Sequence, residues 1–316
     1  MLNQWLFEGK FNEEVRSARE AMEIAGLDWQ VRVEEIESYK TVSGKTIDVP
    51  DFLPLKHLVI RDDSAVLGTV GKRYRVVQNV SAFDFFDSIV ESGKATYESA
   101  GSFEGGRVVW LCAKITDDAL IAGKDKIKRY ILLLNSHNGR FPVSAMLIPW
   151  RVVCSNMLSF SIGFAKRKGV YIKARHTEMF SNRFGAAQRI FKQALNEYLE
   201  LEKVYAQMAL RKMTKDELLE YANNVIELSK AESSLMKSMR EKRRDEIVEY
   251  AYSSPGCEMF PGTLWNAYNA AVRFADILVE QRNEKTGVKS ANTLFYGGSS
   301  YLKDRAFVEA QRMLSL

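Results

Sequence analysis

Residues 95–135 read ATYESAGSFEGGRVVWLCAKITDDALIAGKDKIKRYILLLN, and this stretch decides the fold class. Three of its segments are rich in β-branched, aromatic and other apolar residues. Gly105-Gly106 and the polar stretch 117–126 separate these segments, and both are typical of turns between strands. The pattern therefore predicts an antiparallel meander. Its predicted strands are 95–103, 106–116 and 127–135.

The residues before this meander predict more β structure behind a first helix. Apolar side chains at three- and four-residue spacing predict a helix over 11–27. From Trp29 the apolar residues alternate, which is the period of a strand. Ser81 has the position of an N-cap for a helix over 80–92 that ends at Gly93. The strands predicted between the two helices are 29–33, 58–61, 66–70 and 74–78.

The residues after the meander change to a helical pattern. Pro149 suits the first turn of a helix and predicts one over 149–162, followed by a last strand at 170–175. Thr214 and Glu217 have the spacing of a capping box. We therefore predict an α+β fold, with an antiparallel sheet and packed helices in residues 1–177 and a helical region in 178–316. The helices predicted in that region are 178–213, one from 214, 232–252, 263–283 and 300–314.

Composition limits the classes of protein to which the chain can belong. With 46% hydrophobic and 27% charged residues in 316, it is long enough to bury a sizeable core. The start of the chain lacks the pattern of a signal peptide, and no apolar run is long enough to cross a membrane. The three cysteines form no close pair, which disfavours a disulfide framework or a structural zinc site. We expect a cytoplasmic protein with reduced, mostly buried thiols.

Positive charge is concentrated in one part of the chain. Residues 124–192 contain 14 Lys or Arg and 2 Asp or Glu, an excess of 14 − 2 = 12, although the whole chain carries only +5. The two acids are Asp125 and Glu178. A second basic run, 237–244, is interleaved with acids at helical spacing and is typical of a solvated helix. The concentrated excess favours a polyanionic partner for residues 124–192.

Gly44-Lys45-Thr46 resembles the end of a phosphate-binding loop. Such a loop also needs a glycine five residues earlier, and that position is Tyr39. The segment is more typical of a hairpin turn. We expect neither ATP use nor another cofactor.

The sequence gives weaker support to the hypothesis that the protein is an enzyme. The only histidines are His57, His137 and His176, none at metal-ligand spacing, so no metal site is predicted. Cys154 with His137 or His176 is conceivable as a nucleophile pair, but free cysteines on an apolar face are usually core residues. A metal-dependent nuclease stays open as an alternative, because four carboxylates upstream of the basic segment could meet it in space. They are Asp62, Asp63, Asp84 and Asp87.

Basic residues mixed with aromatic and amide groups are the strongest functional pattern. Lys and Arg neutralise phosphates, while aromatic rings and His stack on unpaired bases without reading sequence. Among them, Tyr74 and His176 are the residues expected to stack. The residues predicted to bind nucleic acid are Lys72, Arg73, Tyr74, Arg75, Lys128, Arg129, Asn135, His137, Arg140, Arg151, Lys166, Arg167, Lys168, Lys173, Arg175 and His176.

Several of these segments resemble the motifs of a protein family of phages and plasmids that is described as a domain of unknown function. The resemblance covers roughly residues 20–310, and the family name implies no activity. The motifs are Leu67–Asn79 (LGTVGKRYRVVQN), Gly106–Ile115 (GRVVWLCAKI), Leu134–Gly139 (LNSHNG), Arg151–Asn156 (RVVCSN), Arg175–Thr177 and Trp265–Ala275, followed by Gly297, Gly298 and Lys303.

The order of predicted elements is also similar, more distantly, to single-strand annealing proteins of the RecT, Redβ and Erf kind. Those proteins place a helix, a β-meander and a second helix in succession, as 80–92, 95–135 and 149–162 are predicted to do. The resemblance implies a basic groove in a ring or filament that anneals single strands without ATP. The turn 135–140 is richer in polar groups than annealing requires, which keeps an enzymatic site open.

The sequence thus predicts a protein, more a binder than an enzyme, that holds single-stranded DNA on a basic sheet face in recombination or replication. Homo-oligomers and a nucleic-acid partner are expected, and a membrane partner is not. Two alternatives stay open. One is the metal-dependent nuclease, and the other is an element-encoded inhibitor whose basic face meets an acidic host defence protein.

Overall fold

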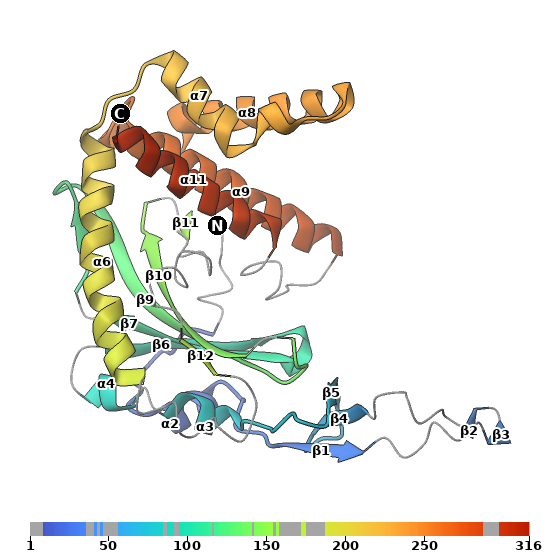
Figure 1. Ribbon diagram of the computed structural model, residues 1–316. Helices are drawn as coiled ribbons and strands as arrows, with labels where there is room; N and C mark the ends of the chain where they lie inside the picture. The colour runs from blue at the N-terminus through green and yellow to red at the C-terminus, as the bar shows by residue number, and fades with distance from the viewer. Residues whose placement is uncertain are drawn as a thin grey trace.

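The chain folds into antiparallel sheets at one end and a group of helices at the other (Figure 1). This α+β class is the predicted one. The computed structural model describes residues 9–35, 41–42, 45–46, 56–84, 87–91, 95–115, 117–140, 142–153, 156–157, 172–174, 187–286 and 297–315.

The predicted meander forms the centre of the larger sheet. β7 is buried at every residue except Lys114, which is why the rest of its sequence is apolar rather than alternating. It pairs antiparallel with β6 on one side and with β9 on the other. The order along the sheet is β11-β10-β9-β7-β6, with β12 on β10 and β8 on β9. The strands are β6 (Ala95–Phe103), β7 (Val108–Ile115), β8 (Ala119–Ile121), β9 (Asp125–Ser136), β10 (Val143–Arg151), β11 (Asn156–Met157) and β12 (Ile172–Ala174).

The prediction of a helix that begins at Pro149 is wrong over the described residues. Pro149 lies inside β10, opposite Arg129 of β9, and β11 follows instead of a helix. On its outer side β10 pairs with β12 at 143–145 and with β11 at 150–151. Pro149 falls between these two ladders, where a missing N–H donor is tolerated. The succession of helix, meander and helix on which the likeness to annealing proteins depends therefore lacks its last element here.

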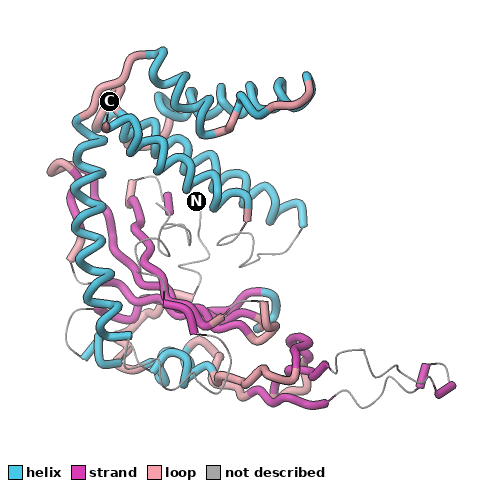
Figure 2. Tube along the Cα trace, viewed as in Figure 1, coloured by secondary structure: helices cyan, strands magenta, loops and turns pink. Residues whose placement is uncertain are grey.

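A second, three-stranded sheet lies beside the first, in the order β1-β4-β5 (Figure 2). It has a small core of its own, formed by Val31, Val59, Leu67 and Val70. Lys45 and Thr46 form a short strand that pairs antiparallel with Thr41 and Val42, and the predicted turn at Gly44 lies outside the described residues. The strands are β1 (Val31–Glu35), β4 (Lys56–Arg61), β5 (Val66–Gly71), β2 (Thr41–Val42) and β3 (Lys45–Thr46).

The short helices near the sheets differ from their predicted bounds. The first helix begins only at Ala18, because Phe11 pairs with β6 through its backbone and Ser17 supplies the N-cap. The helix predicted from Ser81 begins at Asn79 instead. Residues 74–78 form no strand: the Gln78 side chain bonds both backbone groups of Val31, as a strand partner would. The helices are α2 (Ala18–Ile24), α3 (Asn79–Phe83) and α4 (Asp87–Glu91), and the 3-10 turn η2 covers Glu104–Gly106.

The C-terminal helices form as predicted and share one core with the larger sheet. Tyr205 of α6 packs against Trp265 of α9 at 5.0 Å between ring centroids, and both belong to the apolar cluster that contains Ile131 of β9. Lys303 and Asp276 form a buried ion pair of 2.5 Å between α11 and α9. No helix in the described part of the chain has the length and apolarity to cross a membrane. The helices are α6 (Ala187–Leu210), α7 (Lys215–Val225), α8 (Ser234–Ser253), α9 (Leu264–Thr286) and α11 (Gly298–Leu314), with 3-10 turns η4 (Leu228–Lys230) and η5 (Cys257–Met259).

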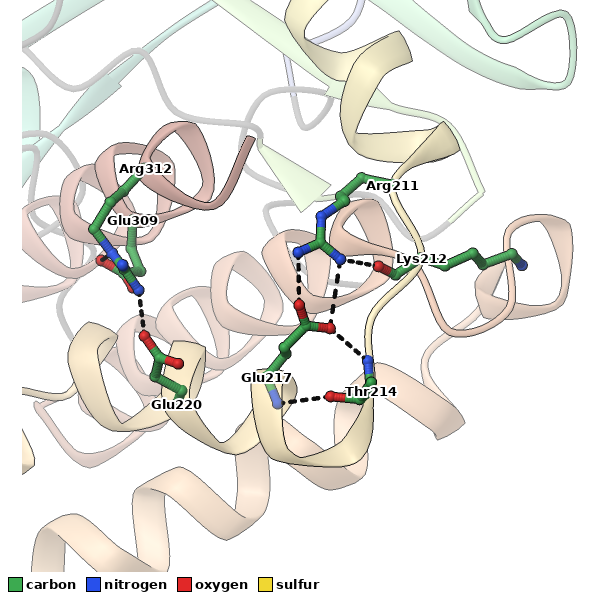
Figure 3. Close-up of polar contacts among 7 residues, drawn as sticks. All are labelled: Arg211, Lys212, Thr214, Glu217, Glu220, Glu309 and Arg312. Atoms are coloured by element: carbon green, nitrogen blue, oxygen red, sulfur yellow. Dashed lines mark hydrogen bonds and ion pairs between the residues drawn. The ribbon is translucent and has the colours of Figure 1, made fainter. Parts of the chain in front are cut away.

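The predicted capping box of α7 is present (Figure 3). The Thr214 hydroxyl accepts from the Glu217 backbone N–H at 3.2 Å, and the Glu217 carboxylate accepts from the Thr214 N–H at 2.7 Å. Arg211 adds an ion pair of 2.6 Å to the same carboxylate. The hydrogen bond from Arg211 and the one from the Thr214 backbone lower the pKa of Glu217 to about 2.

The lowered pKa of Glu217 predicts a pH dependence of stability. A carboxyl group whose pKa is lower in the folded state stabilises the protein above its unfolded pKa, and this contribution is lost as pH falls toward the folded pKa. We expect Glu217→Gln to lower the thermal midpoint at neutral pH and to have progressively less effect from about pH 4.5 to about pH 2. Thermal unfolding across this pH range checks it, with Glu249→Gln as an exposed control. A difference that does not shrink on acidification would contradict the pKa assignment.

Candidate nucleic-acid interface

The loop after β5, residues 72–75, lies against the turn between β9 and β10. A side chain at Gly68 would lie 2.6 Å from Cα of Asn138, so the two backbones are in close contact. Gly139 has a φ of +69°, and a side chain there would lie 3.0 Å from Val70. The Tyr74 hydroxyl donates to the Ser136 carbonyl at 3.2 Å. Two segments that are far apart in the sequence, and that both belong to the resembling motifs, are thus held together.

The β6–β7 loop meets the same turn. The backbone N–H of His137 donates to the Arg107 carbonyl at 2.8 Å, and the Arg140 guanidinium lies 3.6 Å from the Glu104 carboxylate. Cations from three segments therefore gather at one end of the larger sheet, and all of them are exposed. We call this surface the basic end. It consists of Lys72, Arg73, Arg75, Arg107 and Arg140.

The ion pairs recorded at the basic end leave several of its cations without an acidic partner. Within the described residues, Lys72, Arg73 and Arg107 form no ion pair, and Arg140 pairs with Glu104. Arg61 lies nearby, over the Trp29 ring at 5.2 Å, but Asp63 pairs with it at 2.5 Å. Tyr74 is half-buried against the small core of the three-stranded sheet, and this burial raises the pKa of its phenol.

The predicted cations at the start of β9 lie at the other end of the sheet, roughly 35 Å along the strand. Two of these four cations have an acidic partner there. Arg129 forms two hydrogen bonds of 2.7 Å with Glu202 of α6, and Lys126 lies 2.7 Å from Asp118. Lys124 lies over the Phe260 ring at 5.9 Å, and Lys128 is half-buried. Residues 72–75 and 124–129 therefore do not form one continuous groove.

Asn135 and His137 lie inside the protein rather than on its surface, and both are fully buried. The His137 ring nitrogen Nε2 lies 2.8 Å from Oδ1 of Asn79, and the Asn135 amide donates to the Val77 carbonyl at 2.9 Å. The Asn79 amide in turn donates to the Leu27 carbonyl at 2.9 Å. This cluster joins β9 to the segments around α2 and α3. It fixes the turn of the basic end, and its members do not reach a polymer on the surface.

Asn79→Ala is expected to destabilise the protein by about 2 to 3 kcal/mol, because it leaves buried polar groups of Asn135, His137 and Leu27 without this partner. Urea unfolding measures the change. Asn224→Ala is the matched control, since its exposed amide bonds only Glu309 among the described contacts, and we expect a cost below about 1 kcal/mol there. Equal costs for the two variants would contradict the buried role of Asn79.

Arg151 is also buried, with 1% of its side chain exposed. It forms an ion pair of 2.5 Å with Asp125, whose side chain is fully buried and also accepts from Trp265 at 2.8 Å. The guanidinium donates to the Gly256 carbonyl at 3.1 Å, and Gly256 has a φ of +83° with no room for a side chain. Arg151 therefore joins β10 to the helical region instead of facing a ligand.

The remaining predicted contacts are only partly covered by the structure. The backbone of Lys173 lies opposite Ser144, two strands from the meander and close to the turn of the basic end. The boundary predicted at 177/178 and Cys154 lie outside the described residues. So do the predicted contact residues Lys166, Arg167, Lys168, Arg175 and His176.

The carboxylates considered for a nuclease form no metal-holding group in the described part of the chain. Asp63 pairs with Arg61, while Asp87 accepts from Tyr97 and from the backbone of Ala18, both at 2.6 Å. Among the described residues, no group of three His, Cys, Asp or Glu side chains could hold a metal ion. Asp63 and Asp87 have structural partners instead.

Two residues of the site, Arg107 and Glu104, were not predicted from the sequence. Both belong to the tight loop at Glu104–Gly106 or follow it directly. The sequence does contain a signal for their position, because a charged residue beside a Gly-Gly turn lies at the tip of a hairpin. What the sequence could not show is that this tip meets the turn 138–140.

Comparison with known proteins identifies one family. A family model described as "Domain of unknown function (DUF932)" matches residues 66–294, well over half of the chain. The match includes every residue of the basic end and the buried pair Asp125 and Arg151. No curated protein and no solved structure matches the chain.

Proposed function

The chain belongs to the DUF932 family, a domain of unknown function, and because that description carries no activity, we propose from its surface chemistry that it binds the phosphate backbone of nucleic acid at the basic end. Single-stranded DNA is the preferred ligand. Binding there needs no ATP.

One observation carries this proposal. Exposed cations from three separate segments gather at one end of the sheet, and three of them have no ion-pair partner among the described residues. At the opposite end of the same strand, acids pair with two of the four cations, Lys126 and Arg129. Exposed Lys and Arg that are held in place release counterions when they neutralise phosphates, which is the main source of affinity for a polyanion.

The preference for single strands is supported by the aromatic residue of the loop. Tyr74 lies between Arg73 and Arg75 in the sequence and is only partly buried, and the part of its ring that does not pack against the small core is proposed to stack on an unpaired base. A task in recombination or replication of a phage or plasmid, and assembly into homo-oligomers, rest on the sequence resemblance and are part of the same proposal. Lys173 is a candidate further contact, because its strand position brings it toward the basic end.

A salt series with the unaltered protein tests the proposal. A fluorescein-labelled oligo-dT strand is titrated with protein at increasing salt, beside a duplex of equal length. We expect binding that weakens linearly in log–log form, with a slope of about −2 to −3.5 if three to five phosphates are contacted. Absent binding at low salt, or binding that salt does not weaken, would refute the proposal. Tighter binding of the duplex would refute the strand preference alone.

A further inference from the structure

The β6–β7 loop has an unusual backbone. Glu104, Gly105 and Gly106 all have positive φ, at 54°, 69° and 93°. Glycine adopts this region without steric cost, whereas glutamate does so rarely. Gly106 has a second reason to be glycine besides its positive φ, because a side chain there would lie 3.0 Å from the Arg61 guanidinium. Glu104 thus occupies a position where glycine would be the less strained residue.

The Glu104 side chain is directed into the basic end. Only 9% of it is exposed, whereas 62% of the Arg140 side chain is exposed, and the two lie 3.6 Å apart. A carboxylate shielded from water exerts a stronger field on its neighbours than an exposed one. It lies beside the surface on which the proposed function needs positive charge. A strained backbone at a charged residue of this kind is a reason to look for a functional role.

We propose that Glu104 is an internal competitor for the polyanion. Its carboxylate neutralises Arg140 in the free protein and repels phosphates that approach the basic end. A ligand must overcome this repulsion to bind. Ligands that contact several cations at once are therefore favoured over ligands that contact one. This inference rests on the proposed function. The opposing reading is that Glu104 is a structural anchor that holds the turn 138–140 in place, in which case its removal should weaken binding.

Glu104→Gln separates the two readings, because glutamine keeps the shape of the side chain and removes the charge. Affinity for the labelled oligo-dT strand is measured at low salt. We expect binding about three- to tenfold tighter than that of the unaltered protein, as follows from removing one charge at roughly 7 Å at a dielectric between those of the protein surface and water. The control is Glu200→Gln on α6, which makes the same charge change in an exposed ion pair with Lys203.

Glu104→Gly adds a second readout that does not depend on the ligand. It removes both the carboxylate and the strained φ, so we expect tighter binding together with an unchanged or higher thermal midpoint. A lower midpoint with weaker binding would identify Glu104 as an anchor and overturn the inference. Affinity no higher for Glu104→Gln than for Glu200→Gln would overturn it as well. If the unaltered protein binds no oligonucleotide at low salt, the proposed function itself fails, which is a distinct result.

Discussion

Asp125→Ala is expected to lower the free energy of unfolding by about 3 to 5 kcal/mol, because it removes the carboxylate that lies 2.5 Å from the buried Arg151 guanidinium. The Trp265 indole N–H loses its acceptor in the same step. Asp125 and Arg151 are 0% and 1% exposed, so water cannot replace the lost partner. The substitution also cuts the link between the sheet and the helical region. Chemical unfolding followed by tryptophan fluorescence measures the change.

Two variants make this result specific. Arg151→Met in the Asp125→Ala background removes the buried charge that has lost its Asp125 partner, and we expect it to recover part of the loss. Asp245→Ala breaks an exposed ion pair with Arg244 and is expected to cost less than about 1 kcal/mol. If Asp125→Ala costs no more than Asp245→Ala, the buried pair does not hold the two regions together.

Joint replacement of Arg73, Arg75 and Arg140 by glutamine is expected to weaken binding of single-stranded DNA by about 30- to 300-fold at low salt. Each lost phosphate contact removes favourable counterion release, and the salt slope should fall by about 2 for three contacts. All three side chains are exposed, so folding should be little affected. Fluorescence anisotropy with the labelled strand gives both the affinity and the slope.

The control for this variant lies at the opposite end of the same sheet. Joint replacement of Lys124, Lys126 and Lys128 by glutamine removes the same amount of charge. Because this end is partly neutralised by Asp118 and is remote from the basic end, we expect a loss of less than about fivefold there. Equal losses in the two variants would mean that net charge, not the basic end, determines binding.

Local sequence patterns predict the parts of the fold in which local and long-range interactions favour the same secondary structure. The continuous apolar run of β7 is typical of a strand covered on both faces, and the capping box of Thr214 and Glu217 satisfies the helix end by itself. Pro149 shows the opposite case. Its local preference for a helix start is outweighed by pairing of the whole of β10 with β9, and no nearby residue reports that pairing.

The site was predicted less well, because burial of polar residues depends on long-range partners. Asn135 and His137 follow the apolar run of β9, and their polar character suggested a surface turn, but Asn79 supplies their partner from another segment. The sequence pattern likewise predicts Arg151 as one of the cations that contact nucleic acid. The useful signal was Asp125, one of only two acids in residues 124–192, since an isolated acid at a buried strand position commonly pairs with a buried cation.

The central claim is that nucleic acid contacts the basic end, and photo-crosslinking locates that contact most directly. A single strand that carries iodouracil is irradiated in complex with the unaltered protein, and the linked peptides are identified by mass spectrometry. We expect the links in peptides that contain residues 72–75 or 138–140, because these segments carry exposed residues of the basic end. Links confined to residues 124–129 or to the C-terminal helices, in a complex that does form, would contradict the account.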